Sequence, residues 1–310
     1  MDRVTLLLVC LVATAIAPAP AAQPSPAAQP KPTPPARHAS LPAGSPDGKQ
    51  VVFSSDRDGR KQELYVADVA TGLSRRLTYS DEEKGVPEWT EGGKRIAYTV
   101  SHGDTTELKT VALDGSGTRK LLTCVAKSIK LSNDGRRVAY TVGSWTRNRI
   151  WVADVNGSHA CALTDSTNGF FNLAWSPDDR VLAVTHHDST GSLQLWLVNP
   201  DTVAKPRELV RLPESEGRPQ WPAWSPDGRT IAFQTGNYVR EDPTKRDAYV
   251  CVVNVASGKV SKLRTHPRPW LDETPAWLDG DHIAFQSTQT GAFEIWVMKA
   301  DGTEARRVTR

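Results

Sequence analysis

Two adjacent histidines, His186 and His187, are the residues of this sequence whose types best suit metal binding. Neutral imidazole nitrogens are common ligands of zinc and other transition metals. If a strand runs through this pair, the two side chains point to opposite sides, and one ion can hardly use both. A third ligand must then come from another part of the chain, such as His102 or His266. We keep His186 and His187 as candidate ligands and assign no metal site.

Aromatic and arginine side chains gather in two long segments of the C-terminal third. One segment holds Tyr238 and Arg240, and the other holds Arg268 and Trp270. Tyr, Trp and Arg dominate the energetics of protein interfaces, because they bury large areas at a modest entropic cost. These four residues form the predicted partner-binding site. The alternative is that Trp270 only holds its own segment against the fold.

The sequence contains no recognisable catalytic or cofactor motif. Gly-x-Ser-x-Gly, the phosphate loop, the Rossmann fingerprint and zinc-finger spacing do not occur in it. We therefore assign no catalytic residue and no bound cofactor. The net charge is +3, from 38 basic and 35 acidic residues. A balance so close to neutral argues against nucleic-acid binding, which depends on many phosphate contacts.

The first 37 residues differ in composition from the rest. Residues 1–21 read as a signal peptide, with an apolar run shorter than the roughly 20 residues of a membrane-spanning helix. Residues 22–37 form a Pro/Ala-rich linker that cannot bury a core. An uncleaved anchor at the membrane surface is the alternative for residues 1–21. The mature chain is expected to lack a membrane span and to be periplasmic or secreted.

The three cysteines of the mature chain, Cys124, Cys161 and Cys251, match no metal motif. They are expected to be unpaired thiols. One bridge between Cys124 and Cys161 is the alternative, because an exported compartment permits disulfides.

A phrase of the form Trp-Ser-Pro-Asp-Gly recurs through residues 38–310. The turn glycine, or the aspartate that replaces it, stands at Gly48, Gly93, Gly135, Asp179, Gly228 and Gly280. Two short apolar runs follow each turn, and most repeats end in Leu-Thr or Val-Thr. A period of roughly 45 residues is typical of four-stranded propeller blades. The sequence therefore predicts an all-β, six-bladed β-propeller with four antiparallel strands per blade.

The phrase begins with tryptophan in four repeats, at Trp89, Trp175, Trp224 and Trp277. We expect these side chains to pack between neighbouring blades, with Trp224 deeply buried. Stacking on a ligand is the alternative. The ring is expected to close through apolar contacts between the first and last blades. Gly44 stands where the first blade lacks its tryptophan, which makes this junction the expected weak point.

Strand direction divides the loops between two faces of a propeller. The turns within the phrase are short and lie on one face, whereas the longer loops and the blade-to-blade crossings lie on the other. Function is expected on this second face. Its acidic crossings, such as residues 81–83, also offer oxygen ligands for Ca²⁺ in the central channel.

With its Ser-Pro-Asp-Gly turns and Leu-Thr endings, the sequence resembles the TolB-like propellers built from the WD40-like PD40 repeat. The resemblance covers residues 38–310 and implies the propeller part of TolB without the α/β domain that precedes it there. It points to a monomeric, exported scaffold that binds another protein, such as one associated with the cell envelope. Related propellers imply two alternatives, a polysaccharide lyase or hydrolase with its site at the channel mouth, or the propeller fragment of a prolyl-oligopeptidase-like protein.

Overall fold

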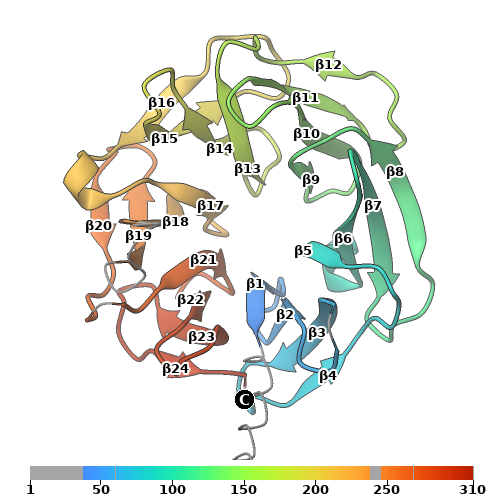
Figure 1. The fold of residues 1–310 in the computed structure, drawn as a ribbon, viewed down its shortest axis with the longest axis vertical. Coiled ribbons are helices and arrows are strands. Elements are labelled where there is room, and N and C mark those ends of the chain that lie inside the picture. The colour runs from blue at the N-terminus through green and yellow to red at the C-terminus, as the bar shows by residue number, and fades with distance from the viewer. Residues whose placement is uncertain (1–37, 60, 238–245, 268, 310) are drawn as a thin grey trace, which may run out of the picture. The chain divides into compact units, whose positions relative to one another are not determined.

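The computed structural model describes residues 38–59, 61–237, 246–267 and 269–309. Within these residues, the chain forms six four-stranded antiparallel sheets around a central opening (Figure 1). The predicted all-β, six-bladed propeller is therefore confirmed. The signal peptide and linker predicted for residues 1–37 lie outside the described residues and stay predictions.

Each blade consists of four consecutive strands, ordered from the centre outwards, so no strand is exchanged between the ends of the described propeller. Blade one contains β1 (Ala39–Gly44), β2 (Gln50–Ser55), β3 (Glu63–Asp68) and β4 (Ser74–Arg76). Blade two contains β5 (Lys84–Thr90), β6 (Arg95–His102), β7 (Thr105–Ala112) and β8 (Arg119–Cys124). Blade three contains β9 (Ile129–Leu131), β10 (Arg137–Gly143), β11 (Asn148–Asp154) and β12 (Cys161–Ala162). Blade four contains β13 (Gly169–Trp175), β14 (Leu182–His187), β15 (Leu193–Val198) and β16 (Arg207–Arg211). Blade five contains β17 (Gln220–Trp224), β18 (Thr230–Asn237), β19 (Asp247–Asn254) and β20 (Val260–Lys262). Blade six contains β21 (Asp272–Trp277), β22 (His282–Ser287), β23 (Glu294–Lys299) and β24 (Arg306–Arg307).

The helices of the described chain are two single 3₁₀ turns, η1 (Glu91–Gly93) and η2 (Glu214–Glu216). Neither has the length or the apolar character that crossing a bilayer requires, and no other helix is found in this part of the chain.

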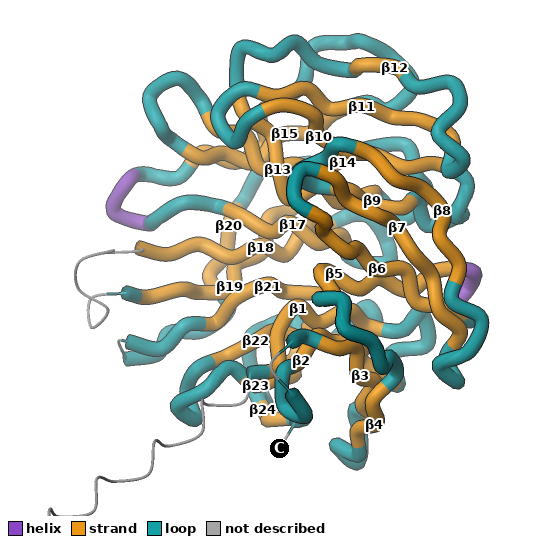
Figure 2. The backbone as a smooth tube through the Cα atoms, turned by 45° about the vertical axis from the view of Figure 1, so that its right-hand side comes forward, coloured by secondary structure: helices purple, strands orange, loops and turns teal. Residues whose placement is uncertain are grey.

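The repeated phrase forms the turn between the first and second strands of a blade. In blade one, the Ser45 hydroxyl donates to Asp47 at 2.6 Å and accepts the backbone N–H of Gln50 at 2.9 Å. The hydroxyl of Ser45 also helps to hold the pKa of Asp47 below its usual range. The same two bonds recur in three further blades, at Ser132 and Asp134, Ser176 and Asp178, and Ser225 and Asp227. Figure 2 shows the loops and turns of the described chain in teal, as connections of different lengths between the ends of the strands.

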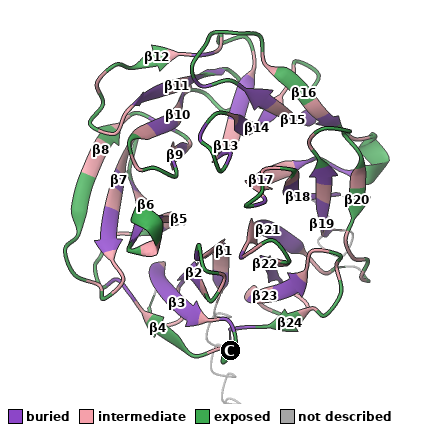
Figure 3. Cartoon of the chain, turned by 180° about the vertical axis from the view of Figure 1, so that it is seen from behind, coloured by how far each residue is buried: buried purple, intermediate pink, exposed green. Residues whose placement is uncertain are grey.

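The core lies between the blades. The described residues form six clusters of buried apolar side chains, one at each junction of neighbouring blades. Phe53, Phe233 and Phe285 occupy equivalent positions in second strands and are fully buried. Figure 3 shows that buried residues concentrate in the second and third strands of the blades, such as β2, β3, β14 and β15, whereas the outermost strands β4 and β24 are largely exposed. Each blade is therefore stabilised mainly by its two neighbours.

The junction between blades six and one closes the ring through the same kind of cluster. Ala39 and Phe53 pack with Leu278 and Ile295, as expected from the sequence. In addition, the backbone N–H of Ala39 donates to the carbonyl of Phe293 at 2.8 Å. Closure through apolar contact is therefore confirmed. The relative weakness of this junction stays a prediction.

The repeat tryptophans correct one expectation. Trp224 is only half-buried, because its strand is the innermost of the blade and one side of the indole faces the channel. Its indole N–H donates to the carbonyl of Ala174 in the preceding blade at 3.2 Å. The same bond joins three other pairs of blades, from Trp89 to Ala43, from Trp175 to Lys130 and from Trp277 to Ala223. These residues therefore both tie the blades together and line the channel.

All three cysteines of the described chain are free, so the Cys124–Cys161 bridge is not formed in this structure. Cys251 is buried, and burial raises the pKa of its thiol to about 12. A thiol with so high a pKa is unreactive at neutral pH, in keeping with a packing role.

Candidate functional site

A cavity of about 660 Å³ lies along the central channel, between the innermost strands of all six blades. At one end it is lined by residues of the repeat turns, including Pro46, Pro177 and Pro226. At the other end it is lined by residues of the long-loop face, including Trp145 and Thr106. The volume is within the usual range for ligand sites, which is roughly 300–1,000 Å³.

The long-loop end of the cavity has an aromatic mouth. Trp145 lies in the loop between β10 and β11 and is 59% exposed, which is unusual for tryptophan. Its ring meets that of Phe171 edge to face, with centroids 6.2 Å apart. Trp221 of β17 also lines the cavity and is half-buried. Exposed rings of this kind offer a large apolar surface to a ligand without any rearrangement of the core.

A β-bulge places one side chain of an innermost strand into the channel. The pairing of first and second strands shifts register at this point in five blades. In four of them the bulged residue has positive φ, at Leu41 (55°), Asn172 (49°), Trp221 (54°) and Thr274 (47°). Positive φ is uncommon for residues other than glycine, and bulges often redirect side chains beside functional sites. All four of these residues line the cavity.

The bulges are held from the neighbouring blade. The N–H of Leu41 donates to the side-chain oxygen of Gln286 at 3.0 Å, and the N–H of Thr274 donates to Gln234 at 2.8 Å. A buried polar partner of this kind compensates a backbone group that the shifted register leaves without a strand partner. The channel wall is therefore preorganised.

Few charges line the channel. Among the described lining residues, the charged ones are Glu88, Lys127 and Lys130. Glu88 and Lys130 form an ion pair with each other. The acidic crossings that were expected to hold Ca²⁺, such as residues 81–83, are not among these lining residues. A calcium ion inside the described part of the channel would find one carboxylate, which Lys130 already neutralises.

Three residues of the predicted partner-binding site, Tyr238, Arg240 and Arg268, lie outside the described residues. The fourth, Trp270, is half-buried, and its ring centroid lies 6.0 Å from that of His266. His266 in turn stacks on Tyr249, at 4.5 Å. These contacts are those of a side chain that holds its own crossing in place. A partner-binding role for the four residues stays a prediction.

The candidate metal ligands His186 and His187 follow the strand alternation expected for them. His186 is buried between the rings of Phe170 and Trp196, at centroid distances of 5.0 and 4.4 Å. Its Nδ1 is 2.7 Å from the side-chain oxygen of Gln194. Within the described residues, neither histidine belongs to a group of three potential ligands.

Burial lowers the pKa of His186 below its usual value near 6.5. The unfolded chain therefore takes up more protons than the folded protein as the pH falls below this value, and stability decreases. We expect the urea midpoint to fall between pH 7 and pH 5, and to fall less in His186→Gln. His187→Gln, which changes the adjacent and less buried histidine, is the control. Equal pH dependence in all three proteins would exclude this role of His186.

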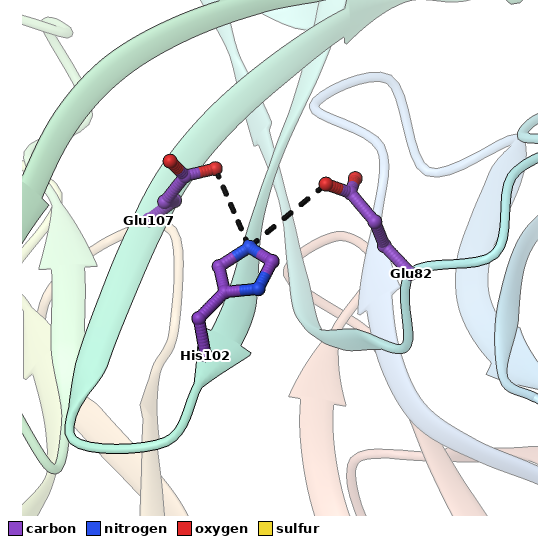
Figure 4. A group of neighbouring side chains, drawn as sticks. All are labelled: Glu82, His102 and Glu107. Atoms are coloured by element: carbon purple, nitrogen blue, oxygen red, sulfur yellow. Dashed lines mark ion pairs between the residues drawn. The ribbon is translucent and has the colours of Figure 1, made fainter.

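One group of three potential ligands does form, at Glu82, His102 and Glu107 (Figure 4). His102 Nε2 lies 3.9 Å from Glu82 Oε1 and 3.6 Å from Glu107 Oε2. The ammonium of Lys109 already lies between the carboxylates, at 2.7 Å from Glu82 and 3.0 Å from Glu107. This lysine supplies the positive charge that a metal would bring, so we treat the group as an ion-pair network.

Comparison with known proteins identifies the propeller. Residues 137–310 match the family described as the TolB beta propeller domain. The chain belongs to this family. The resemblance of its repeats to TolB-like propellers is thereby confirmed.

Matches to curated relatives cover only part of each relative's length. The chain is 30% identical over 135 residues to an uncharacterized protein of Agrobacterium fabrum, which is 43% of this chain and 41% of that protein. It is 39% identical over 80 residues to the Tol-Pal system protein TolB of Anaeromyxobacter dehalogenans, 26% of this chain and 18% of that one. The aligned regions thus span less than half of either relative.

Solved structures agree with the TolB-type fold. A putative TolB from Agrobacterium tumefaciens superposes with a TM-score of 0.64 at 19% identity, covering 79% of this chain and 87% of that one. An oligogalacturonate lyase in complex with manganese superposes with a TM-score of 0.57 at 16% identity, covering 88% and 78%. At such identities the likeness shows the fold alone.

The sequence analysis did not bring Trp145, Phe171 and Trp221 together as one site. For Trp221, the signal that could have located it is the register of the repeat. Trp221 lies three residues before the tryptophan of its phrase, on the innermost strand. Any residue at that position in any blade faces the channel.

Proposed function

We propose that this protein is an exported scaffold that binds another protein by taking an extended segment of its partner into the central channel. The aromatic lining of the channel carries this proposal. Trp145 and Phe171 stand at the mouth, and Trp221 and Trp224 lie further along the wall. Aromatic side chains in a preformed, weakly charged cavity are well suited to bind peptide without a large cost of reorganisation.

The export and partner parts of the proposal have separate support. The predicted signal at residues 1–21 supports a periplasmic or secreted location. The family match and the partial identity to a Tol-Pal system protein support a protein as partner. Lyase or hydrolase chemistry would need an acid and a base at the channel. Among the described lining residues, the single carboxylate is that of Glu88, which is paired with Lys130.

The test uses peptides selected on the purified, folded protein from a random library displayed on phage. The double variant Trp145→Ala, Phe171→Ala removes the mouth while leaving the buried clusters intact. We expect the selected peptides to bind it at least about tenfold more weakly, as for an interface hot spot. The matched control is Leu73→Ala, Tyr79→Ala, which removes two side chains that are 76% and 74% exposed on the outer edge of blade one.

A further inference from the structure

Each blade contributes one residue at the same level of the channel, three positions before the tryptophan position of the phrase. These six residues are Leu41, Val86, Ser128, Asn172, Trp221 and Thr274, and all of them line the cavity. We call them the bulge ring. The residue that follows is proline in four blades, whereas the bulge ring holds six different residue types. The position in the repeat is therefore shared by all six blades, whereas the side chain that it presents to the channel differs from blade to blade.

The bulge ring has two unlike sides. Blades three and four contribute Ser128 and Asn172, which are polar, through β13 and the segment just before β9. The opposite side, on blades one and six, carries Leu41 and Thr274, and blade five adds Trp221. In Figure 1, β9 and β13 face β1 and β21 across the opening. A ligand at this level therefore meets hydrogen-bonding groups on one edge. On the other edge it meets mainly the apolar surface of Leu41 and Trp221, together with the hydroxyl of Thr274, which has no partner in the described chain.

The polar side also carries the free positive charge of the channel. Lys127 precedes Ser128, is exposed and lines the cavity. Among the described residues, no carboxylate lies within ion-pair distance of its ammonium, whereas Lys130 is paired with Glu88. An acidic group on the ligand would supply a partner of opposite charge for this ammonium.

Trp221 is the largest member of the bulge ring and sits at a φ of 54°. For a bulky residue this is a backbone outlier, which the fold tolerates most cheaply with glycine. Strain of this kind persists where the surrounding structure enforces it, and it occurs most often at functional sites. Here the indole lines the cavity and is half-buried, so part of its surface is available to a ligand.

We infer that the bulge ring, with Lys127, selects extended segments in which acidic and large apolar side chains alternate. Successive side chains of an extended peptide point to opposite edges. An acidic residue toward Lys127 therefore places its sequence neighbours toward Trp221 and Leu41. This inference rests on the proposed function and specifies which peptide chemistry the channel accepts.

The experiment uses the same phage-selected peptides and three variants of the full chain. Trp221→Gly removes the indole and leaves a residue that accepts positive φ, so folding is preserved. Lys127→Glu reverses the charge of the polar side. Lys259→Glu reverses an exposed charge on the outer hairpin of blade five and is the control. Melting curves verify that each variant is folded.

We expect the selected peptides to be enriched in alternating acidic and apolar residues. We also expect their affinity to fall about tenfold or more in Trp221→Gly and in Lys127→Glu, and to stay unchanged in Lys259→Glu. A library selected anew on Lys127→Glu should lose the acidic residue. Unchanged affinity in both channel variants, for peptides that still require Trp145 and Phe171, would overturn this inference alone. Peptides that do not require the mouth would overturn the proposed function itself.

Discussion

Phe233→Ala is expected to lower the free energy of unfolding by about 3–5 kcal/mol, the usual cost of truncating a fully buried phenylalanine. Phe233 is completely inaccessible and packs at the junction of blades four and five with Leu195, Val210 and Cys251. The loss combines apolar transfer with a cavity that strands on both sides can fill only in part.

Trp224→Ala provides the comparison at the same junction. Trp224 is larger than Phe233 but only half-buried, and its indole N–H bond to Ala174 is one hydrogen bond, worth about 1 kcal/mol. The alanine variant should therefore lose less stability than Phe233→Ala. Urea unfolding followed by circular dichroism measures both. A larger loss for Trp224→Ala would show that the tryptophan row, and not the second-strand phenylalanines, holds these blades together.

Gly44→Ala is expected to destabilise the protein by about 1–3 kcal/mol or more, as overpacking does. A Cβ at this position would lie 2.3 Å from the carbonyl oxygen of Trp277 and 2.7 Å from the Cα of Leu278. Both neighbours are backbone atoms, so they cannot yield by a change of rotamer. Gly44→Trp should destabilise the protein more than Gly44→Ala does, even though tryptophan is the commonest residue at this position of the repeats.

Gly280→Ala is the control for this prediction, because a Cβ there has open space around it. It should change stability by no more than about 0.5 kcal/mol, as at other unconstrained surface positions. If Gly44→Ala were as stable as Gly280→Ala, blades one and six would not be in close backbone contact. The urea midpoints of Gly44→Ala and Gly280→Ala, measured under the same conditions, test this prediction.

The fold was predictable because its information is local and repeated. A Ser-Pro-Asp-Gly turn needs only residues within about five positions, as the Ser45 and Asp47 bonds show. Six related turns at a regular interval, four of them with the same Ser and Asp bonds, leave few alternatives to a propeller. The role of the tryptophans was half predictable. Their contact with a neighbouring blade was expected. Their exposure to the channel was not expected, because it depends on which strand is innermost and on how close that strand lies to the channel.

The candidate site was less predictable because it depends on register. The bulge that turns Trp221 and Asn172 into the channel is a shift of strand pairing, and no residue type announces it, since a positive φ is normally marked by glycine. Trp145 and Phe171 lie 26 positions apart in blades three and four, and only the packing of these neighbouring blades brings the ring centroids to 6.2 Å. Composition alone favoured Tyr238 and Trp270 instead, because their two segments contain aromatic and arginine residues.

The claim that the channel is the binding site is tested most directly by one ratio of dissociation constants. The numerator is the dissociation constant of a selected peptide from the mouth double variant, Trp145→Ala with Phe171→Ala. The denominator is that of the same peptide from the control double variant, Leu73→Ala with Tyr79→Ala. Both constants are measured by calorimetry on folded protein. Each variant loses two apolar or aromatic side chains. One pair, the exposed Trp145 and the half-buried Phe171, lies at the channel mouth, and the other pair is exposed on the outer edge of blade one. Binding in the channel predicts a ratio of about ten or more. A ratio near one, with both variants binding as the unsubstituted protein does, would contradict it.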